Sequence, residues 1–171
     1  PSLSVLESLR LDATPEFANQ ASLWAARAYG CEGDAESSLS LLAEVRQQQP
    51  FTGANIAAGI EELEWLAGMG NGEEALQTVR YLLREIGNEQ NYDGSLVDLE
   101  SFRTRVIAAL QTLRQKERFK HCIAIAQTLP VLLPETDAVY EEAITYRAIA
   151  DQIISTKQGA NKEIEPEALL A

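Results

Sequence analysis

The sequence predicts an all-α protein in which antiparallel helix–turn–helix hairpins stack side by side. Apolar residues recur at three- and four-residue steps through most of the chain, which is typical of one face of a helix. No segment alternates apolar and polar residues for long enough to indicate a β-strand. The turns between helices are expected near Gly33, Gly72 and Lys116, at steps of about 40 residues, which indicates one repeated unit.

The first hairpin is expected at about residues 16–50. Thr14 is a suitable N-cap, and Pro15 suits the first position of a helix, where its missing N–H removes no hydrogen bond. Gly33 marks the turn, and Pro50 ends the unit because proline cannot continue a helix. The apolar face of the first helix is predicted to consist of Phe17, Ala21, Trp24, Ala25 and Ala28.

Three further hairpins are expected at about residues 52–88, 95–130 and 135–155, the last of them only half complete. Gly87 with Asn88 is expected to end the second hairpin, and prolines end the third. The starts of the helices are supported by possible caps at Thr52, Asn71 with Glu74, Ser95 with Asp98, and Thr136 or Asp137. The third hairpin's apolar stripe is predicted to begin at Leu96, and the last helix's stripe to be Val139, Ala143, Tyr146, Ile149, Ala150 and Ile153.

Both ends of the chain differ from the repeated unit. Residues 3–11 predict a short helix, which either belongs to a preceding repeat or covers the first hairpin. After a repeat domain at 1–155, residues 156–171 form a polar tail whose composition is typical of a mobile terminus. The chain begins at Pro1 without a methionine, so we expect a processed product or a fragment, and the cellular location stays open.

The first hairpin also carries a family pattern. Ala26, Tyr29, Gly33 and Pro50 follow the order and approximate spacing of the tetratricopeptide (TPR) repeat, which the chain resembles over residues 16–154. The resemblance implies a right-handed α-solenoid whose first helices line a concave face. It also implies a non-catalytic scaffold that binds a peptide or a partner helix in that face.

Composition narrows the class of partner. The net charge of −12 disfavours binding to nucleic-acid phosphates and to anionic membrane surfaces. No apolar run approaches the roughly 20 residues that a membrane-spanning helix needs, and no signal-peptide pattern is present. We therefore expect a protein or peptide partner, with no nucleic acid and no membrane insertion.

No pattern of residues predicts catalysis, a metal site or a cofactor. The only histidine, His121, is followed by Cys122, but adjacent residues of a helix point in different directions and cannot form a dyad. Glu61, Glu62 and Glu64 form an acidic cluster without an accompanying histidine or second carboxylate pair. We interpret this cluster as a solvated helix face.

Two other features have simple interpretations. Cys31 and Cys122 lie in different predicted hairpins and form no CxxC pair, so we interpret both as small packing residues, with a disulfide between hairpins as the alternative. Asp93-Gly94 is a common turn pair, and the residues after it lack the alternating oxygen ligands of a calcium loop.

Charge is unevenly distributed along the chain. No Lys or Arg occurs between Gln47 and Val79, whereas six of the 14 basic residues fall between Arg103 and Lys120. One interpretation is a basic patch for an acidic peptide or for the acidic end of another copy. The other is an ordinary pair of solvated helices, whose charges contribute little to stability.

A partner-binding surface is predicted on the first helices of the hairpins. Trp24 lies on the apolar stripe and is interpreted as a core residue, whereas Trp65 lies just off its stripe and is the better candidate for exposure. The predicted partner-binding residues are Asn55, Glu62, Trp65, Arg103, Arg105 and Gln111.

Three functions are compatible with these observations. The first is the interaction scaffold that the TPR resemblance implies. The alternative is a structural segment or oligomerisation module of a larger repeat protein, which would associate with itself through the ends of the solenoid. The third is an enzyme or a small-molecule carrier that uses the groove between helix pairs, although no catalytic residue, metal or cofactor can be assigned to it.

Overall fold

A computed structural model describes residues 3–12, 14–48, 52–86 and 92–162. Within these ranges the chain forms α-helices and one 3₁₀ turn, with no β-strand, which confirms the predicted all-α class. The elements are α1 (Leu3–Asp12), α2 (Pro15–Glu32), α3 (Ala35–Gln48), α4 (Gly53–Met69), α5 (Gly72–Ile86), α6 (Leu99–Gln115), α7 (Phe119–Ala126), η2 (Leu129–Val131) and α8 (Glu135–Lys162).

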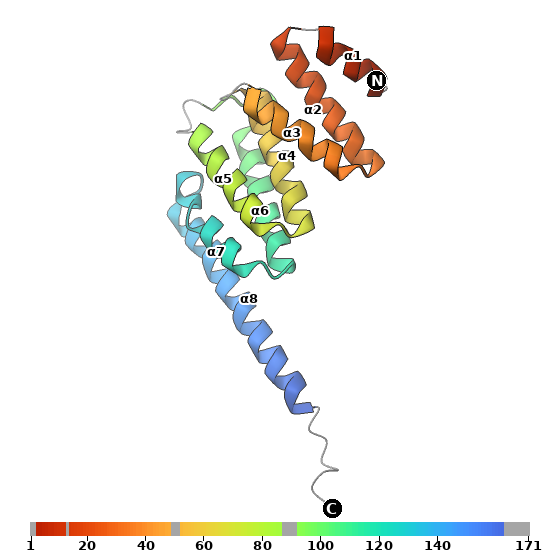
Figure 1. Ribbon diagram of the computed structural model, residues 1–171. Coiled ribbons are helices and arrows are strands. Elements are labelled where there is room, and N and C mark those ends of the chain that lie inside the picture. Colours follow the sequence, from red (N-terminus) through yellow and green to blue (C-terminus); the bar gives the residue numbers. More distant parts are fainter. Residues whose placement is uncertain (1–2, 13, 49–51, 87–91, 163–171) are drawn as a thin grey trace, which may run out of the picture.

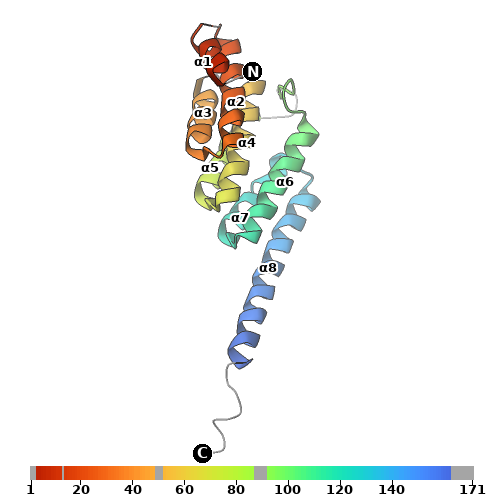
Figure 2. The same ribbon diagram turned by 90° about the vertical axis from the view of Figure 1, so that its right-hand side faces the viewer.

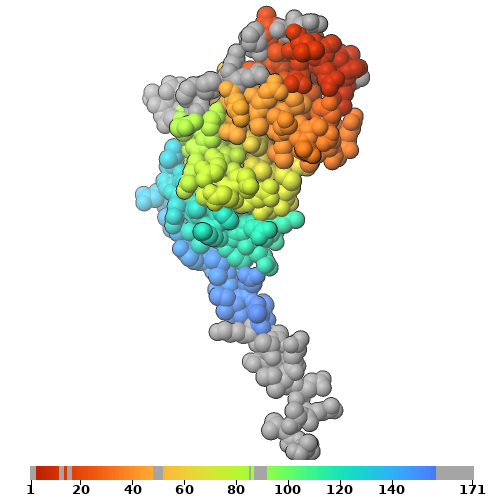
Figure 3. Space-filling view, viewed as in Figure 1, coloured from red at the N-terminus to blue at the C-terminus, as the bar shows by residue number. Residues whose placement is uncertain are grey.

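The helices form an elongated stack whose order in space follows the chain (Figures 1 and 3). Neighbours in sequence pack together from α1 to α5, and again from α6 through α7 to α8. Contacts between hairpins join first helix to first helix, α2 to α4 and α4 to α6, and second helix to second helix, α5 to α7. This arrangement is a solenoid-like stack of hairpins, as the repeated pattern predicts.

Left-handed glycines end two of the first helices. Gly33 has φ = 84° after α2, and Gly70 has φ = 75° after α4, and the backbone N–H of each donates to a carbonyl in the last turn of its helix. At the start of α4, the Thr52 hydroxyl accepts a hydrogen bond from the Asn55 backbone N–H at 3.2 Å. Thr14 occupies the N-cap position of α2, but its side chain makes no capping hydrogen bond.

The third hairpin begins later than its apolar pattern predicts. Asp98 is itself the N-cap of α6, because its carboxylate accepts a hydrogen bond from the Ser101 backbone N–H at 2.8 Å. Ser95 instead donates its backbone N–H to Asp93 in the preceding loop. Leu96 therefore lies outside the helix and is exposed, and Val97 is buried in its place.

The core is continuous and centred on α4, which packs against α2, α3, α5 and α6. Every residue from Gly53 to Ile60 is buried. Small side chains let the neighbouring helices approach closely, and a Cβ built on Gly59 would lie 2.6 Å from Leu82 Cδ2 of α5. Because helices pack against α4 on several sides, some of its polar residues are buried along with its apolar ones.

Some of the predicted apolar faces are not covered. Phe17 and Trp24 of α2 are exposed, so the interpretation of Trp24 as a core residue is wrong. Most of the predicted stripe on the last helix is also exposed, namely Val139, Ala143, Tyr146, Ala150 and Ile153. Helix α8 also runs past the predicted boundary at residue 155 and projects away from the body in both ribbon views (Figures 1 and 2).

The remaining sequence expectations have mixed outcomes. Both cysteines are free, and Cys122 is a buried packing residue as expected, but Cys31 is exposed. The proposed terminators Pro50, Gly87 and Asn88, and tail residues 163–171, lie outside the described residues. None of the described helices combines the length and the apolar character that crossing a membrane would require.

Candidate partner-binding groove

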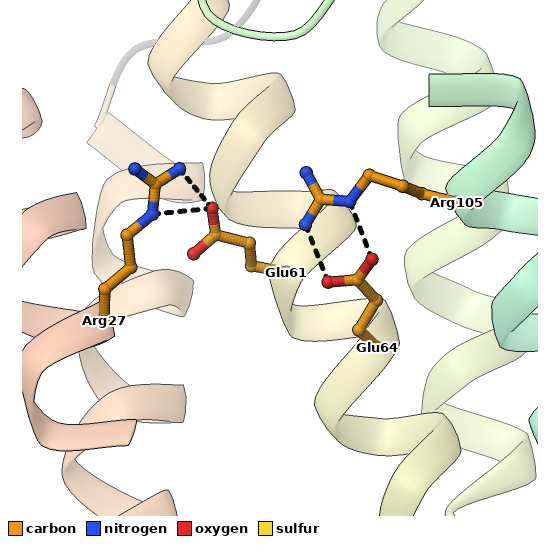
Figure 4. A network of polar contacts seen from close by, with 4 residues as sticks. All are labelled: Arg27, Glu61, Glu64 and Arg105. Atoms are coloured by element: carbon orange, nitrogen blue, oxygen red, sulfur yellow. Dashed lines mark hydrogen bonds and ion pairs between the residues drawn. The ribbon is translucent and has the colours of Figure 1, made fainter. Parts of the chain in front are cut away.

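A groove of about 580 Å³ runs over one face of the stack, between the first helices of three successive hairpins. Helices α2, α4 and α6 supply its walls, with α4 in the middle (Figure 4). The residues that line it are Arg27, Gly30, Cys31, Glu61, Glu64, Trp65 and Arg105.

One wall of the groove is fixed by an ion pair between α2 and α4. Arg27 donates from Nε at 2.9 Å and from Nη2 at 2.5 Å to the same oxygen, Oε1 of Glu61. The Arg27 guanidinium also lies 4.5 Å from the centre of the Trp24 ring, a cation–π contact on the same helix. About a third of the Arg27 side chain remains exposed, so the pair faces the groove as well as the neighbouring helix.

The opposite wall is fixed by a second ion pair, between α4 and α6. Arg105 donates from Nε to Oε1 of Glu64 at 2.7 Å and from Nη2 to Oε2 at 2.6 Å, which is the two-pronged geometry of a strong guanidinium–carboxylate pair. The hydrogen bonds to the Glu64 carboxylate raise the pKa of Arg105 above its ordinary value. Figure 4 shows Arg27 of α2 and Arg105 of α6 reaching toward α4 from either side, each to its own carboxylate.

Trp65 lies between the two walls and is half-buried against the core. A Cβ built on Gly30 would lie 2.9 Å from Trp65 Cζ2, so the indole rests directly on the glycine backbone of α2. The groove therefore combines an aromatic surface with two partly exposed pairs of opposite charges.

Of the six predicted partner-binding residues, only Trp65 and Arg105 line this groove. Arg103 donates from Nε to the backbone oxygen of Leu132 at 2.8 Å and so holds the loop after α7. Gln111 is exposed on α6, outside the groove.

Two of the six are wrong as surface residues. Asn55 is fully buried, and its amide donates to the Arg46 backbone oxygen and to the Tyr81 hydroxyl. Glu62 is 8% exposed and pairs with Arg46, with Nε and Oε2 2.7 Å apart. Burial raises the pKa of Glu62 above its ordinary value, and Arg46 opposes that shift. Both residues join the first hairpin to the second inside the stack.

Several residues of the acidic second hairpin and the basic third hairpin make polar contacts with each other inside the molecule. The acidic second hairpin faces the basic third one, where Arg105 pairs with Glu64 and Arg118 donates to the backbone oxygen of Gly70 at 2.8 Å. His121 Nε2 lies 3.6 Å from a Glu73 carboxylate oxygen at the same junction. These contacts weaken the hypothesis of a free basic patch, and the acidic cluster of α4 is not a solvated face.

Sequence reasoning missed most of the residues that line the groove. Arg27 and Glu61 are 34 residues apart, and Glu64 and Arg105 are 41 residues apart. Neither offset joins equivalent positions of successive hairpins, because the turn glycines Gly33 and Gly70 are 37 residues apart. The repeat pattern of the sequence therefore carries no signal that pairs these residues.

Comparison with models of protein families, with curated proteins and with solved structures finds no match for this chain. The TPR resemblance therefore stays a prediction. Among the described residues, no group of three or more His, Cys, Asp or Glu side chains is placed to hold a metal ion.

Proposed function

We propose that this chain is a non-catalytic, TPR-like interaction scaffold that binds a peptide segment of a protein partner in the groove between α2, α4 and α6. The observation that carries the proposal is the position of the groove. It crosses the first helices of three successive hairpins, which is the face that binds peptides in repeat proteins of this architecture. The stacking of successive hairpins, with first helix against first helix, supports the TPR-like assignment.

The chemistry of the groove suits a peptide that carries both charges around an apolar side chain. Trp65 offers a flat apolar surface held in place by Gly30. The side chains of the ion pairs on either side are 13–39% exposed, so charged groups of a peptide can reach them. A carboxylate of the peptide would bind Arg27 or Arg105, and an ammonium or guanidinium would bind Glu64.

Cys31 provides a direct test because its side chain is exposed at the groove and makes none of the ion pairs there. Peptides would be selected from a random phage-displayed library on the whole chain, and their affinities measured by fluorescence anisotropy. Cys31→Trp fills the groove, and Cys31→Ser is the matched control. We expect Cys31→Trp to weaken binding at least about tenfold, and Cys31→Ser to leave it unchanged.

A second readout uses the reactivity of the same residue. Bound peptide should protect Cys31 from N-ethylmaleimide, and Cys122 should stay unmodified because it is buried and burial raises its pKa to about 11. Selected peptides that bind Cys31→Trp normally and leave Cys31 fully reactive would contradict the proposal, as would a library that yields no binder.

The second candidate function, an assembly module, is favoured by a different observation. The outer face of α8 is apolar and exposed, and its contacts with the body use other residues. This face lies outside the groove and can be tested independently of it.

A further inference from the structure

Helix α8 has two distinct faces. Ala138, Glu141 and Thr145 are buried on the side that packs against α7 and η2. The stripe residues on the other side follow one another at steps of four, three, four and three, which is the spacing of a coiled-coil seam. All are exposed, with Val139 58%, Tyr146 53% and Ile153 50% accessible, and Ala143 and Ala150 completing the set. We call these five residues the α8 stripe.

The sizes of the stripe residues alternate. Val139, Tyr146 and Ile153 are large, and the residues between them, Ala143 and Ala150, are small. A parallel pair of such helices would stack alanine on alanine and tyrosine on tyrosine, leaving voids in one layer and crowding the next. An antiparallel pair places a large residue against a small one in successive layers, which fills space evenly.

We propose that the α8 stripe is a self-association surface, through which α8 pairs antiparallel with α8 of a second copy. In this register Tyr146 of one copy lies opposite Ala150 of the other, and Ile153 lies opposite Ala143. Both copies contribute the same surface to this contact, so the assembly is a closed dimer with twofold symmetry. Projection of α8 away from the body leaves room for the second helix (Figures 1 and 2).

Apolar residues beside the stripe fit the same register. Tyr140 and Ile154 are 64% and 53% exposed, and each follows a stripe residue directly in sequence. They lie on one edge of the stripe, near its two ends. Antiparallel pairing brings Tyr140 of each copy beside Ile154 of the other. The twofold symmetry therefore gives two equivalent contacts, which cover both ends of this edge.

Charge acts differently at the middle and at the ends of the stripe. Arg147 follows Tyr146 directly and lies on the same edge as Tyr140 and Ile154, so this register brings Arg147 of the two copies together near the twofold axis, each 3.9 Å from Asp151 of its own chain. At the ends of α8 the charges are complementary. In the sequence the first turn of α8 is acidic, with Glu135 and Asp137, and an antiparallel partner brings its far end, whose sequence contains two lysines, beside that turn.

A different surface competes for the α8 stripe. An apolar groove of about 240 Å³ lies between α1 and α2, lined by Leu6, Leu9, Phe17, Gln20, Ala21 and Trp24. Docking of α8 into this groove would join unlike surfaces, head to tail, and would build open chains of many copies instead of a dimer. The alternating sizes of the stripe and the exposed edge residues Tyr140 and Ile154 favour the self-pairing, because one antiparallel register covers both.

The assembly can be measured by sedimentation velocity on the whole chain from about 1 µM to about 500 µM. We expect a monomer–dimer equilibrium. Tyr146→Lys puts a charge in the centre of the seam and should raise the dissociation constant at least about 100-fold. Gln152→Lys is the matched control, because Gln152 is an exposed residue of the same helix outside the stripe, and it should leave the dimer intact.

The direction of pairing can be read by disulfide trapping in a Cys31→Ser background. Chains with Ala143→Cys and chains with Ile153→Cys should cross-link when mixed. Ile153→Cys alone should not, because antiparallel pairing separates the two copies of that position by about 15 Å along the helix.

Three results would overturn the inference: a monomer at every concentration, efficient cross-linking of Ile153→Cys alone, or assembly that Trp24→Lys abolishes while Tyr146→Lys does not. Cys31→Trp is expected to leave the dimer unchanged, so failure of the groove and failure of the α8 stripe are distinguishable.

Discussion

Arg114 shows how a single side chain can position a helix in this fold. Its guanidinium is buried and donates from Nη1 to the Glu141 carboxylate at 2.8 Å and to the Glu141 backbone oxygen at 3.2 Å. The Thr145 hydroxyl lies 3.5 Å from the same nitrogen. A buried ion pair gains little net stability because both charges lose their hydration, but removing one partner leaves the other unpaired. The pair therefore fixes where α8 lies against α6 more than it strengthens the fold.

That reasoning predicts strongly non-additive mutations. Arg114→Leu should lower the free energy of unfolding by about 3–5 kcal/mol, because the Glu141 carboxylate stays buried without its partner. The double variant Arg114→Leu/Glu141→Leu should recover most of that loss. Urea unfolding followed by circular dichroism measures both. A double variant no more stable than Arg114→Leu alone would show that the pair itself stabilises the protein.

A second residue gives the stability a defined dependence on pH. The Ser101 hydroxyl and backbone N–H donate to the Asp98 carboxylate, and these hydrogen bonds hold the pKa of Asp98 below its ordinary value of 3.8. The folded state therefore binds this proton less readily than the unfolded state. The contribution of Asp98 is complete above pH 3.8 and is lost as the pH falls through the lowered pKa.

Asp98→Ala should accordingly be less stable than the natural sequence at neutral pH. The gap should be smaller at an acidic pH below 3.8, where the folded protein begins to bind the proton. Urea midpoints at the two pH values provide the comparison, with Glu100→Ala on the same turn as a control. A gap of constant size at both pH values would mean that the capping geometry matters and the charge does not.

At the scale of the element, periodicity predicts which segments are helices but not what covers each face. The stripe of α4 could be read from the sequence, yet Asn55 and Glu62 lie off that stripe and are buried. They are buried because α2, α3, α5 and α6 all pack against α4, and the periodicity of one helix does not contain that information. The converse holds for Trp24 and Tyr146, which lie on predicted apolar stripes and are nevertheless exposed.

The close approach of α4 and α5 gives a test within one helix. Gly59→Ala would place a Cβ 2.6 Å from Leu82 Cδ2 in the core, and overpacking of this kind lowers stability by about 1–3 kcal/mol. Gly68 lies in the same helix with open space around it, so Gly68→Ala should raise stability by up to about 0.5–1 kcal/mol. Thermal or urea unfolding should separate the two variants in opposite directions. Equal effects would show that α5 does not press on α4 at Gly59.

At the scale of the molecule, the sequence predicts the stack better than the site. The hairpin period and the turn glycines indicated the order of the elements. The groove depends on pairs such as Glu64 with Arg105, whose partners lie 41 residues apart on different hairpins. The sequence shows that the second hairpin is rich in acidic residues and the third in basic residues. Only the packing of α4 against α6 shows that these opposite charges pair with each other.

A stack in which each hairpin touches only its neighbours should not open uniformly. Helix α4 contacts α2, α3, α5 and α6, so its backbone can open only when hairpins on both sides come apart. Residues 150–156 of α8 are all exposed, and a helical segment without packing is marginal in water.

Hydrogen exchange measured by mass spectrometry at low protein concentration should find the slowest amides in α4 and the fastest described helical amides in α1 and in α8 beyond residue 150. Raising the concentration should slow exchange in α8 alone if two copies pair there, and Tyr146→Lys should remove that dependence. Equal protection in all helices would contradict the view that stability is distributed as a chain of neighbouring interfaces.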